Sequence, residues 1–178
     1  MKMSNRKNVA EVALFSAILV VCAFVSIPAP VPFTMQTFGV FLSAVLLGSK
    51  KGSLVVLIYL LLGAIGLPVF SGARAGIGTI FGQTGGYITG FLPAAFLTGK
   101  IFERTKKSPL AMAFSMVLGL LCVYIVGSLW FSLAYFKNAK TDGFIGVISV
   151  SVLPFIIPDL LKIGLAVYTA KGILKFRH

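Results

Sequence analysis

Long apolar runs fill most of the chain, and short stretches rich in proline, glycine or lysine separate them. Three prolines between Pro28 and Pro32 forbid a regular helix there, and glycines with lysines interrupt the pattern at 48–52. A membrane-spanning helix needs roughly 20 apolar residues. The pattern therefore predicts one all-α transmembrane domain over 1–178, a bundle of six helices at about 9–27, 33–47, 53–67, 77–98, 109–136 and 154–174.

Two details of this pattern stay open. The second and third runs are short, so we expect these helices to lean on neighbours or to have irregular ends. The start of the last helix lies anywhere from Gly146 to Pro158.

The first apolar run follows Lys2, Arg6 and Lys7, as in a signal peptide, but it is long enough to span the membrane and further spans follow. We expect an uncleaved first helix.

The composition agrees with a membrane protein. Hydrophobic residues make up 58% of the 178 residues, charged residues only 11%, and the mean hydropathy is +1.01. The formal net charge of +12 would suggest nucleic-acid binding in a soluble protein. Here the basic residues occupy the gaps between apolar runs, which is typical of cytoplasmic anchoring. Nucleic acid is therefore not an expected partner.

The basic residues alternate between the two sides of the predicted bundle. Counted by loop, 12 fall on one side and three on the other, with Lys162 left inside a span. Cytoplasmic loops carry the excess of lysine and arginine. Six spans with both termini cytoplasmic satisfy this rule, in a multi-pass protein of the plasma membrane. The three residues of the outer side are Arg74, Lys137 and Lys140.

Asp159 and Lys162 carry the strongest chemical signal, because they lie within an otherwise apolar span. Each charge at membrane depth costs roughly 2.5–3.5 kcal/mol on insertion scales. The i,i+3 spacing brings both side chains to one helix face, within pairing reach. If Pro158 begins the helix, the helix dipole also favours the Asp159 carboxylate. A structural ion pair is one interpretation, and we favour the other, a ligand site.

Other polar residues fall at the same depth as this pair on the predicted topology. They lie in the outer halves of two helices and in an outer loop: Thr34, Gln36, Arg74, Gln83 and Tyr87. Their convergence predicts one outward-facing pocket for a small polar ligand. Lys162 and Arg74 can neutralise a carboxylate, whereas Asp159 can accept N–H groups of an amide or urea. Aromatic residues that can pack against an apolar body are Phe33, Phe70, Phe81, Tyr87 and Phe155.

Small residues recur at helical spacing in two places. Gly78, Gly82, Gly86 and Gly90 form a stripe along the helix expected at 77–98, which favours close helix contact over backbone approach to a ligand. The face formed by Ala13 and Ala17 suits packing within the bundle or docking to another subunit.

Three blocks of sequence resemble the BioY family, the biotin-binding S components of energy-coupling factor (ECF) transporters. They lie in order along the chain and read Val31-Pro32-Phe33-Thr34-Met35-Gln36-Thr37-Phe38-Gly39-Val40, Gly82-Gln83-Thr84-Gly85-Gly86-Tyr87 and Pro154-Phe155-Ile156-Ile157-Pro158-Asp159-Leu160-Leu161-Lys162. The family has proline at the position of Gln83. Arg74 lies outside these motifs, so its assignment to the site rests only on its predicted depth in the membrane.

The resemblance implies a six-helix bundle that binds biotin from outside and assembles with a transmembrane coupling subunit and two ATP-binding subunits. ATP hydrolysis then belongs to those partners, and neither a cofactor, a metal nor a catalytic residue is expected in this chain. The resemblance implies that Asp159 binds the ureido N–H groups of biotin. It implies that Lys162 either binds the carboxylate of biotin or pairs with Asp159. It also implies that Ala13 and Ala17 dock to the coupling subunit. The implied site residues are Thr34, Gln36, Gly85, Gly86, Tyr87, Asp159 and Lys162.

A proton-coupled secondary transporter for a small carboxylate-bearing metabolite is the alternative, because it would also use an intramembrane Asp–Lys pair. Such transporters commonly contain inverted repeats, and the sequence has no evident internal repeat. An intramembrane enzyme is disfavoured, because the one histidine is His178 at the chain end.

Overall fold

The computed structural model describes residues 3–28, 31–105, 108–135 and 143–176, and its elements are almost entirely helical. They are α1 (Met3–Phe24), β1 (Ser26–Ile27), β2 (Phe33–Thr34), α2 (Gln36–Ala64), the 3-10 helix η1 (Ser71–Ala73), α3 (Ile77–Ile80), α4 (Gly85–Arg104), α5 (Pro109–Tyr135), α6 (Gly143–Ser151) and α7 (Leu153–Phe176). Several residues used in the sequence analysis lie outside the described ranges: Lys2, Pro30, Lys106, Lys107, Phe136, Lys137, Lys140, Arg177 and His178.

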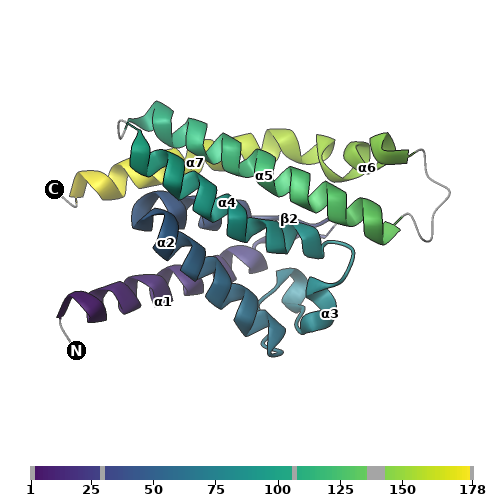
Figure 1. The fold of residues 1–178 in the computed structure, drawn as a ribbon, viewed down its shortest axis with the longest axis horizontal. Coiled ribbons are helices and arrows are strands. Elements are labelled where there is room, and N and C mark those ends of the chain that lie inside the picture. Colours follow the sequence, from purple (N-terminus) through teal and green to yellow (C-terminus); the bar gives the residue numbers. More distant parts are fainter. Residues whose placement is uncertain (1–2, 29–30, 106–107, 136–142, 177–178) are drawn as a thin grey trace.

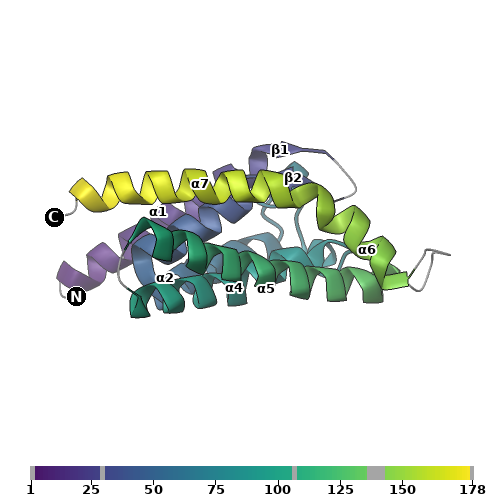
Figure 2. The same ribbon diagram turned by 90° about the horizontal axis from the view of Figure 1, so that it is seen from above.

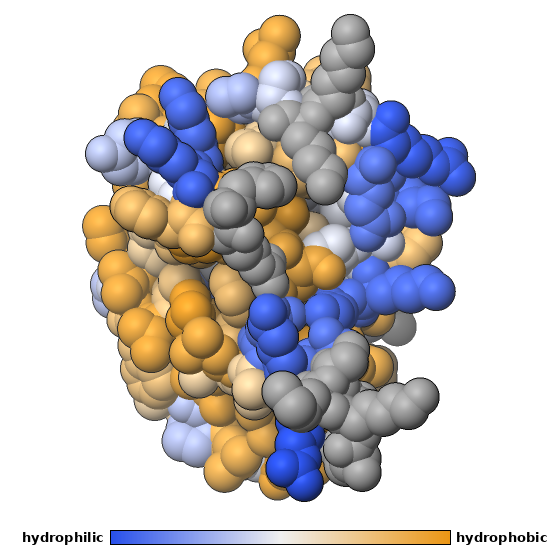
Figure 3. Space-filling model, turned by 90° about the vertical axis from the view of Figure 1, so that its left-hand side faces the viewer, coloured by the Kyte–Doolittle hydropathy of each residue, from blue (hydrophilic) through white to orange (hydrophobic). Residues whose placement is uncertain are grey.

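The long helices lie roughly side by side along the longest axis of the molecule (Figures 1 and 2). The first turns of α1 and the last turns of α7 lie at the same end, which we call the basic end. The space-filling view onto this end has hydrophilic side chains gathered beside an apolar flank (Figure 3). The opposite end carries α3 and α6, and we call it the far end.

Helix α2 doubles back on itself at Gly48. This glycine has φ 83° and ψ 175°, which is not a helical conformation and is accessible mainly to glycine. The amide of Gln36 reaches the hydroxyl of Tyr59 at 2.6 Å, although a straight helix would separate these residues by about 35 Å. Residues 36–47 and 49–64 are therefore two antiparallel arms (Figure 1). The break predicted at 48–52 is confirmed at its first residue.

A carboxylate from α4 holds the turn between the arms. Glu103 accepts hydrogen bonds from the backbone N–H of Ser49 at 2.7 Å and from the Ser49 hydroxyl at 3.0 and 3.1 Å. The second arm thus begins with a negatively charged group at its N-terminus, which the helix dipole favours. Gly99 lies directly against the Ser49 backbone, so α4 and the turn approach as closely as two backbones can.

The first arm of α2 and the middle of α4 form the centre of the bundle. Val40, Phe41, Ala44, Ala94 and Ala95 are fully buried. Large apolar side chains on the outer faces of α1, α5 and α7 are exposed, as lipid contact requires. Among the described residues, four segments are long and apolar enough to cross a membrane by length and composition: Arg6–Phe24, Gln36–Ala64, Pro109–Ala134 and Leu153–Phe176. The second of these contains the turn at Gly48.

The helix expected over 77–98 is divided in the structure. Helix α3 ends at Ile80, and α4 begins at Gly85 and continues to Arg104. Trp130 of α5 donates its indole N–H to the Gly82 carbonyl at 2.9 Å, which satisfies a backbone group that the break leaves outside a helix. The break between α3 and α4 also divides the predicted glycine stripe. Gly86 and Gly90 pack against α5, whereas no atom would contact a Cβ at Gly78.

The ends of the first and last helices also differ from expectation. Helix α1 ends at Phe24, because Ser26 and Ile27 pair with Thr34 and Phe33 in a small antiparallel hairpin. Helix α7 begins at Leu153, with Pro158 inside it, after the separate short helix α6. Asp159 therefore lies in the second turn of α7, and not in the first turn, where a helix start at Pro158 would place it.

Candidate ligand-binding site

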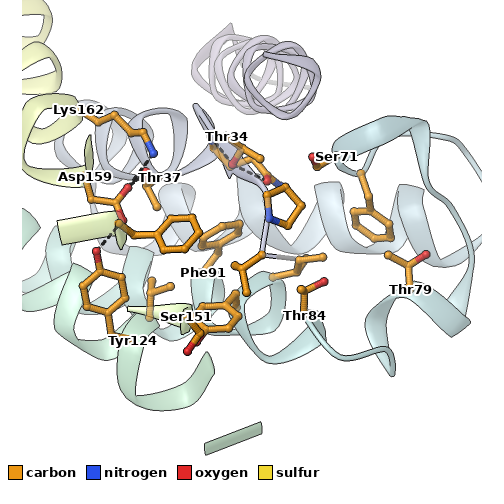
Figure 4. A pocket seen from close by; sticks show the side chains of 18 of the residues that line it. Thr34, Thr37, Ser71, Thr79, Thr84, Phe91, Tyr124, Ser151, Asp159 and Lys162 are labelled. Carbon is orange, nitrogen blue, oxygen red and sulfur yellow. Dashed lines mark hydrogen bonds and ion pairs between the residues drawn. The ribbon is translucent and has the colours of Figure 1, made fainter. Parts of the chain in front are cut away.

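A pocket opens among the elements of the far end. The volume open to the centre of a water molecule is about 70 Å³. Strand β2, the start of α2, the segment after α2 and helices α3, α4, α5, α6 and α7 all contribute side chains (Figure 4). Residues distant in the sequence thus meet around one cavity.

Asp159 is the centre of the polar contacts in this pocket. Its Oδ1 accepts hydrogen bonds from the Lys162 ammonium at 2.8 Å and from the Thr37 hydroxyl at 3.1 Å. Its Oδ2 accepts a hydrogen bond from the Tyr124 hydroxyl at 2.7 Å. Asp159 is only 4% exposed, so three donors from three helices stabilise a carboxylate that is nearly removed from solvent. The predicted Asp159–Lys162 contact is confirmed.

The start of α2 supplies a second polar group. Thr34 donates its hydroxyl to Gln36 Oε1 at 2.8 Å, and Gln36 Nε2 donates to the Tyr59 hydroxyl at 2.6 Å. Tyr59 is fully buried behind Gln36. These two bonds fix the orientation of the amide, which still has one N–H and one acceptor direction for a ligand.

Aromatic rings form much of the remaining wall. Phe70, Tyr87, Phe91 and Phe155 line the pocket. The ring of Phe155 stacks on Phe33 with centroids 4.2 Å apart and an interplanar angle of 20°, which ties the hairpin to α7 beside the cavity. The site therefore combines flat apolar walls with a few oriented polar groups, which suits a ligand with an apolar body and polar ends.

The structure brings together most of the residues that the sequence indicated. Six of them line the pocket: Thr34, Gln36, Arg74, Tyr87, Asp159 and Lys162. Gln83 is exposed and is not among the lining residues. Gly85 and Gly86 are buried in the first turn of α4, where a side chain would overlap the Ile80 carbonyl or Trp130. Of the predicted aromatics, Phe81 is 68% exposed, and its ring lies near Trp130.

Sequence reasoning missed Thr37, Tyr124 and Tyr59. Tyr124 lies in the apolar run of α5, where a tyrosine fits the pattern of a lipid-facing or core residue and gives no distinct signal. Thr37 follows Gln36 directly and lies one helical step from the predicted site, so proximity to that site was the one available indication. Hydroxyl groups of Ser71, Thr79, Thr84 and Ser151 also line the pocket. No group of three potential metal ligands occurs within the described ranges.

Known proteins resemble this chain over nearly its whole length. The sequence profile of the BioY family matches residues 1–178, the whole chain. The chain belongs to the BioY family. Two relatives in this family are described as biotin transporter BioY. That of Thermotoga maritima is 39% identical over 170 residues, covering 95% of this chain and 96% of its own. That of Rhodobacter capsulatus is 40% identical over 182 residues, covering 96% and 95%.

A solved structure has the same fold as this BioY-family chain. It is the 2.1 Å crystal structure of the S-component for biotin from an ECF-type ABC transporter. The two chains superpose with a TM-score of 0.86 and 28% sequence identity, over 98% of this chain and 95% of the other. The likeness of fold therefore extends over the far end as well as the long helices.

Proposed function

We propose that this chain captures biotin in the far-end pocket and imports it as the substrate-binding subunit of an ECF-type ABC transporter. Its family membership and the likeness to an S-component for biotin support this function. The observation that carries the assignment to this pocket is the Asp159 network. A buried carboxylate with oriented donors, enclosed by aromatic walls, suits a cyclic urea fused to an apolar ring.

The proposed site comprises the residues predicted from sequence together with Thr37 and Tyr124. Asp159 accepts the ureido N–H groups, and the aromatic side chains pack against the ring system. Gln36 and Thr34 offer further polar contacts at the hairpin side. Gln83, Gly85 and Gly86 act through the break before α4, which shapes the wall that carries Thr84 and Tyr87. The pocket needs no cofactor; biotin is the transported ligand.

The proposed topology has six membrane crossings with both chain ends in the cytoplasm of a prokaryotic cell. The crossings are α1, the two arms of α2, α4, α5 and α7. The antiparallel arms support this count, because each arm then crosses once. The charge distribution supports the orientation. The turn of α2, with Lys50 and Lys51, and the last turns of α4, with Lys100 and Arg104, lie together at the basic end (Figure 1). The far end then faces outward.

The proposed partners are a transmembrane coupling subunit and two ATP-binding subunits, which perform the ATP hydrolysis. Ala13 and Ala17 are exposed on one face of α1, and this small-residue face offers close helix contact to the coupling subunit. Replacing both with leucine should lower biotin uptake in cells and leave biotin binding by the purified chain unchanged. A parallel loss of binding would refute docking as their role.

Calorimetric titration of biotin into the detergent-purified chain tests the function. We expect 1:1 binding that the double variant Asp159→Ala/Lys162→Ala abolishes. The Lys171→Ala variant, which removes an exposed charge at the other end of α7, is the control and should bind like the wild type. A folded wild-type chain that does not bind biotin would contradict the proposed function.

A further inference from the structure

The ring of Tyr87 lies in a recess that a glycine of the neighbouring helix provides. Tyr87 belongs to the first turn of α4 and lines the pocket, and Gly127 is buried in the interior of α5. A Cβ at Gly127 would lie 2.6 Å from Cγ of the tyrosine ring and closer still to two further ring carbons. Carbon atoms in ordinary contact are about 3.5–4.0 Å apart. The ring therefore occupies the space that a side chain at position 127 would need.

Helices α4 and α5 lie side by side and are packed too closely to move apart at this point (Figures 1 and 2). A Cβ at Gly86 of α4 would overlap Trp130 of α5, whose indole N–H donates to the Gly82 carbonyl at 2.9 Å. A Cβ at Gly90 would lie 3.3 Å from Cβ of Val126. Small residues at these positions bring the two backbones close together. Separation of the helices would break all of these contacts, so the tyrosine ring is the part that gives way.

The pocket is the free space beside the Tyr87 ring. Tyr87 is 8% exposed, and its hydroxyl lies 3.4 Å from Oγ of Ser128 on α5. A ring that leaves the recess by about 1 Å, the distance that restores an ordinary carbon–carbon contact, moves away from α5 and toward the cavity. The volume open to the centre of a water molecule there is only about 70 Å³. A shift of this size therefore removes a large share of the space for a ligand.

We propose that Gly127 is a specificity-determining residue, which sets the width of the pocket through the position of the Tyr87 ring. The proposal rests on the proposed function. Gly127 is not among the residues that line the pocket, so it acts without touching the ligand. Biotin contains two fused rings, and a pocket narrowed at one aromatic wall disfavours two fused rings more than a single ring.

The test compares biotin with desthiobiotin, which has the cyclic urea and the acid chain but lacks the second, sulfur-containing ring. Both are titrated into the purified wild type, Gly127→Ala, Tyr87→Ala and the double variant. We expect Gly127→Ala to weaken biotin binding about tenfold and desthiobiotin binding by a clearly smaller factor. In the Tyr87→Ala background, which itself binds more weakly, Gly127→Ala should change neither affinity further, because the ring through which it acts is gone.

Two controls separate this effect from a general disturbance of the fold. Gly164→Ala is the matched control, because this glycine lies in α7 with open space around it, and the variant should bind both ligands like the wild type. Trp130 is the only tryptophan of the chain, so its fluorescence reports on the contact between α4 and α5. We expect the same emission maximum in Gly127→Ala as in the wild type, because the ring moves and the helices do not.

Equal weakening of the two ligands by Gly127→Ala, or an equal loss in the Tyr87→Ala background, would overturn the proposal. A shifted Trp130 emission, or loss of the folded protein in size-exclusion chromatography, would also overturn it, because the overlap would then be relieved outside the pocket. Failure of the wild type to bind biotin would instead count against the proposed function, so the two failures are distinguishable.

Discussion

The side-chain amide of Gln36 donates a 2.6 Å hydrogen bond to the hydroxyl of Tyr59, 23 residues further along α2. The bond joins the two arms of that helix just behind the pocket wall. Gln36 is 4% exposed and Tyr59 fully buried, so neither group can exchange its partner for water. One contact therefore connects the geometry of the helical hairpin to the geometry of the site.

Replacing Tyr59 with phenylalanine should destabilise the fold, because the buried Gln36 N–H loses its acceptor. We expect the free energy of unfolding to fall by about 1–3 kcal/mol. Thermal unfolding of the detergent-purified protein measures this as a lower melting temperature. Tyr168→Phe is the control, since Tyr168 is 79% exposed on α7. Identical melting temperatures for the two variants would contradict the role of this bond.

Tyr124→Phe should weaken biotin binding while the fold is retained. The variant removes the hydroxyl that donates to Asp159 Oδ2, so the carboxylate is held by Thr37 and Lys162 alone. A hydrogen bond to a charged group is worth about 1.5–3 kcal/mol, which predicts a loss of about 10-fold or more in affinity. Calorimetric titration beside Tyr168→Phe measures it, and an unchanged dissociation constant would exclude Tyr124 from the site.

Phe155→Ala should shorten the time for which biotin stays bound. The stack on Phe33 joins the hairpin to α7, and an aromatic pair contributes about 0.5–1.5 kcal/mol beyond its buried area. We expect dissociation to be several-fold faster, with a smaller change in the association rate. Exchange of labelled biotin against unlabelled biotin gives the rate. Phe114→Ala, which truncates an exposed ring on α5, should leave the rate as it is.

Gly48→Ala should destabilise the turn between the arms of α2. At φ 83° a Cβ is strained, and it would also lie 2.6 Å from the Glu103 carboxylate. Backbone strain of this kind costs about 1–3 kcal/mol. Gly172→Ala is the matched control, because this glycine lies in α7 with open space around it and alanine favours a helix there. Melting temperatures compare the two, and a Gly48→Ala protein as stable as the wild type would refute the strain.

Some features followed from the sequence because a local rule determines them. Gly48 begins the break in α2, and the i,i+3 spacing pairs Asp159 with Lys162. The features that were missed depend on contacts between helices. The break at 81–84 lies in a segment of helical composition, and it is held by Trp130 of another helix.

The residues of the site can also be divided into those that a local rule predicts and those that depend on contacts between helices. Asp159 and Lys162 are conspicuous because charge is rare in an apolar span. Tyr124 belongs to the site because α5 brings its hydroxyl to Asp159, which lies 35 residues further along the chain. No local sequence pattern predicts that contact. Gln83 is adjacent in sequence to residues that line the pocket, yet its side chain is exposed, because the chain leaves the helical path there.

The spacing of Asp159 and Lys162 also bears on how α7 enters the membrane. The ion pair lies within one helix, so it needs no other helix in order to form. During biogenesis, the last span can therefore enter the bilayer with its acid and base already matched, and not as two isolated charges. Thr37 and Tyr124 come from helices synthesised earlier and join the carboxylate only when the bundle assembles. Insertion of α7 and completion of the binding site are thus separable events in the making of this protein.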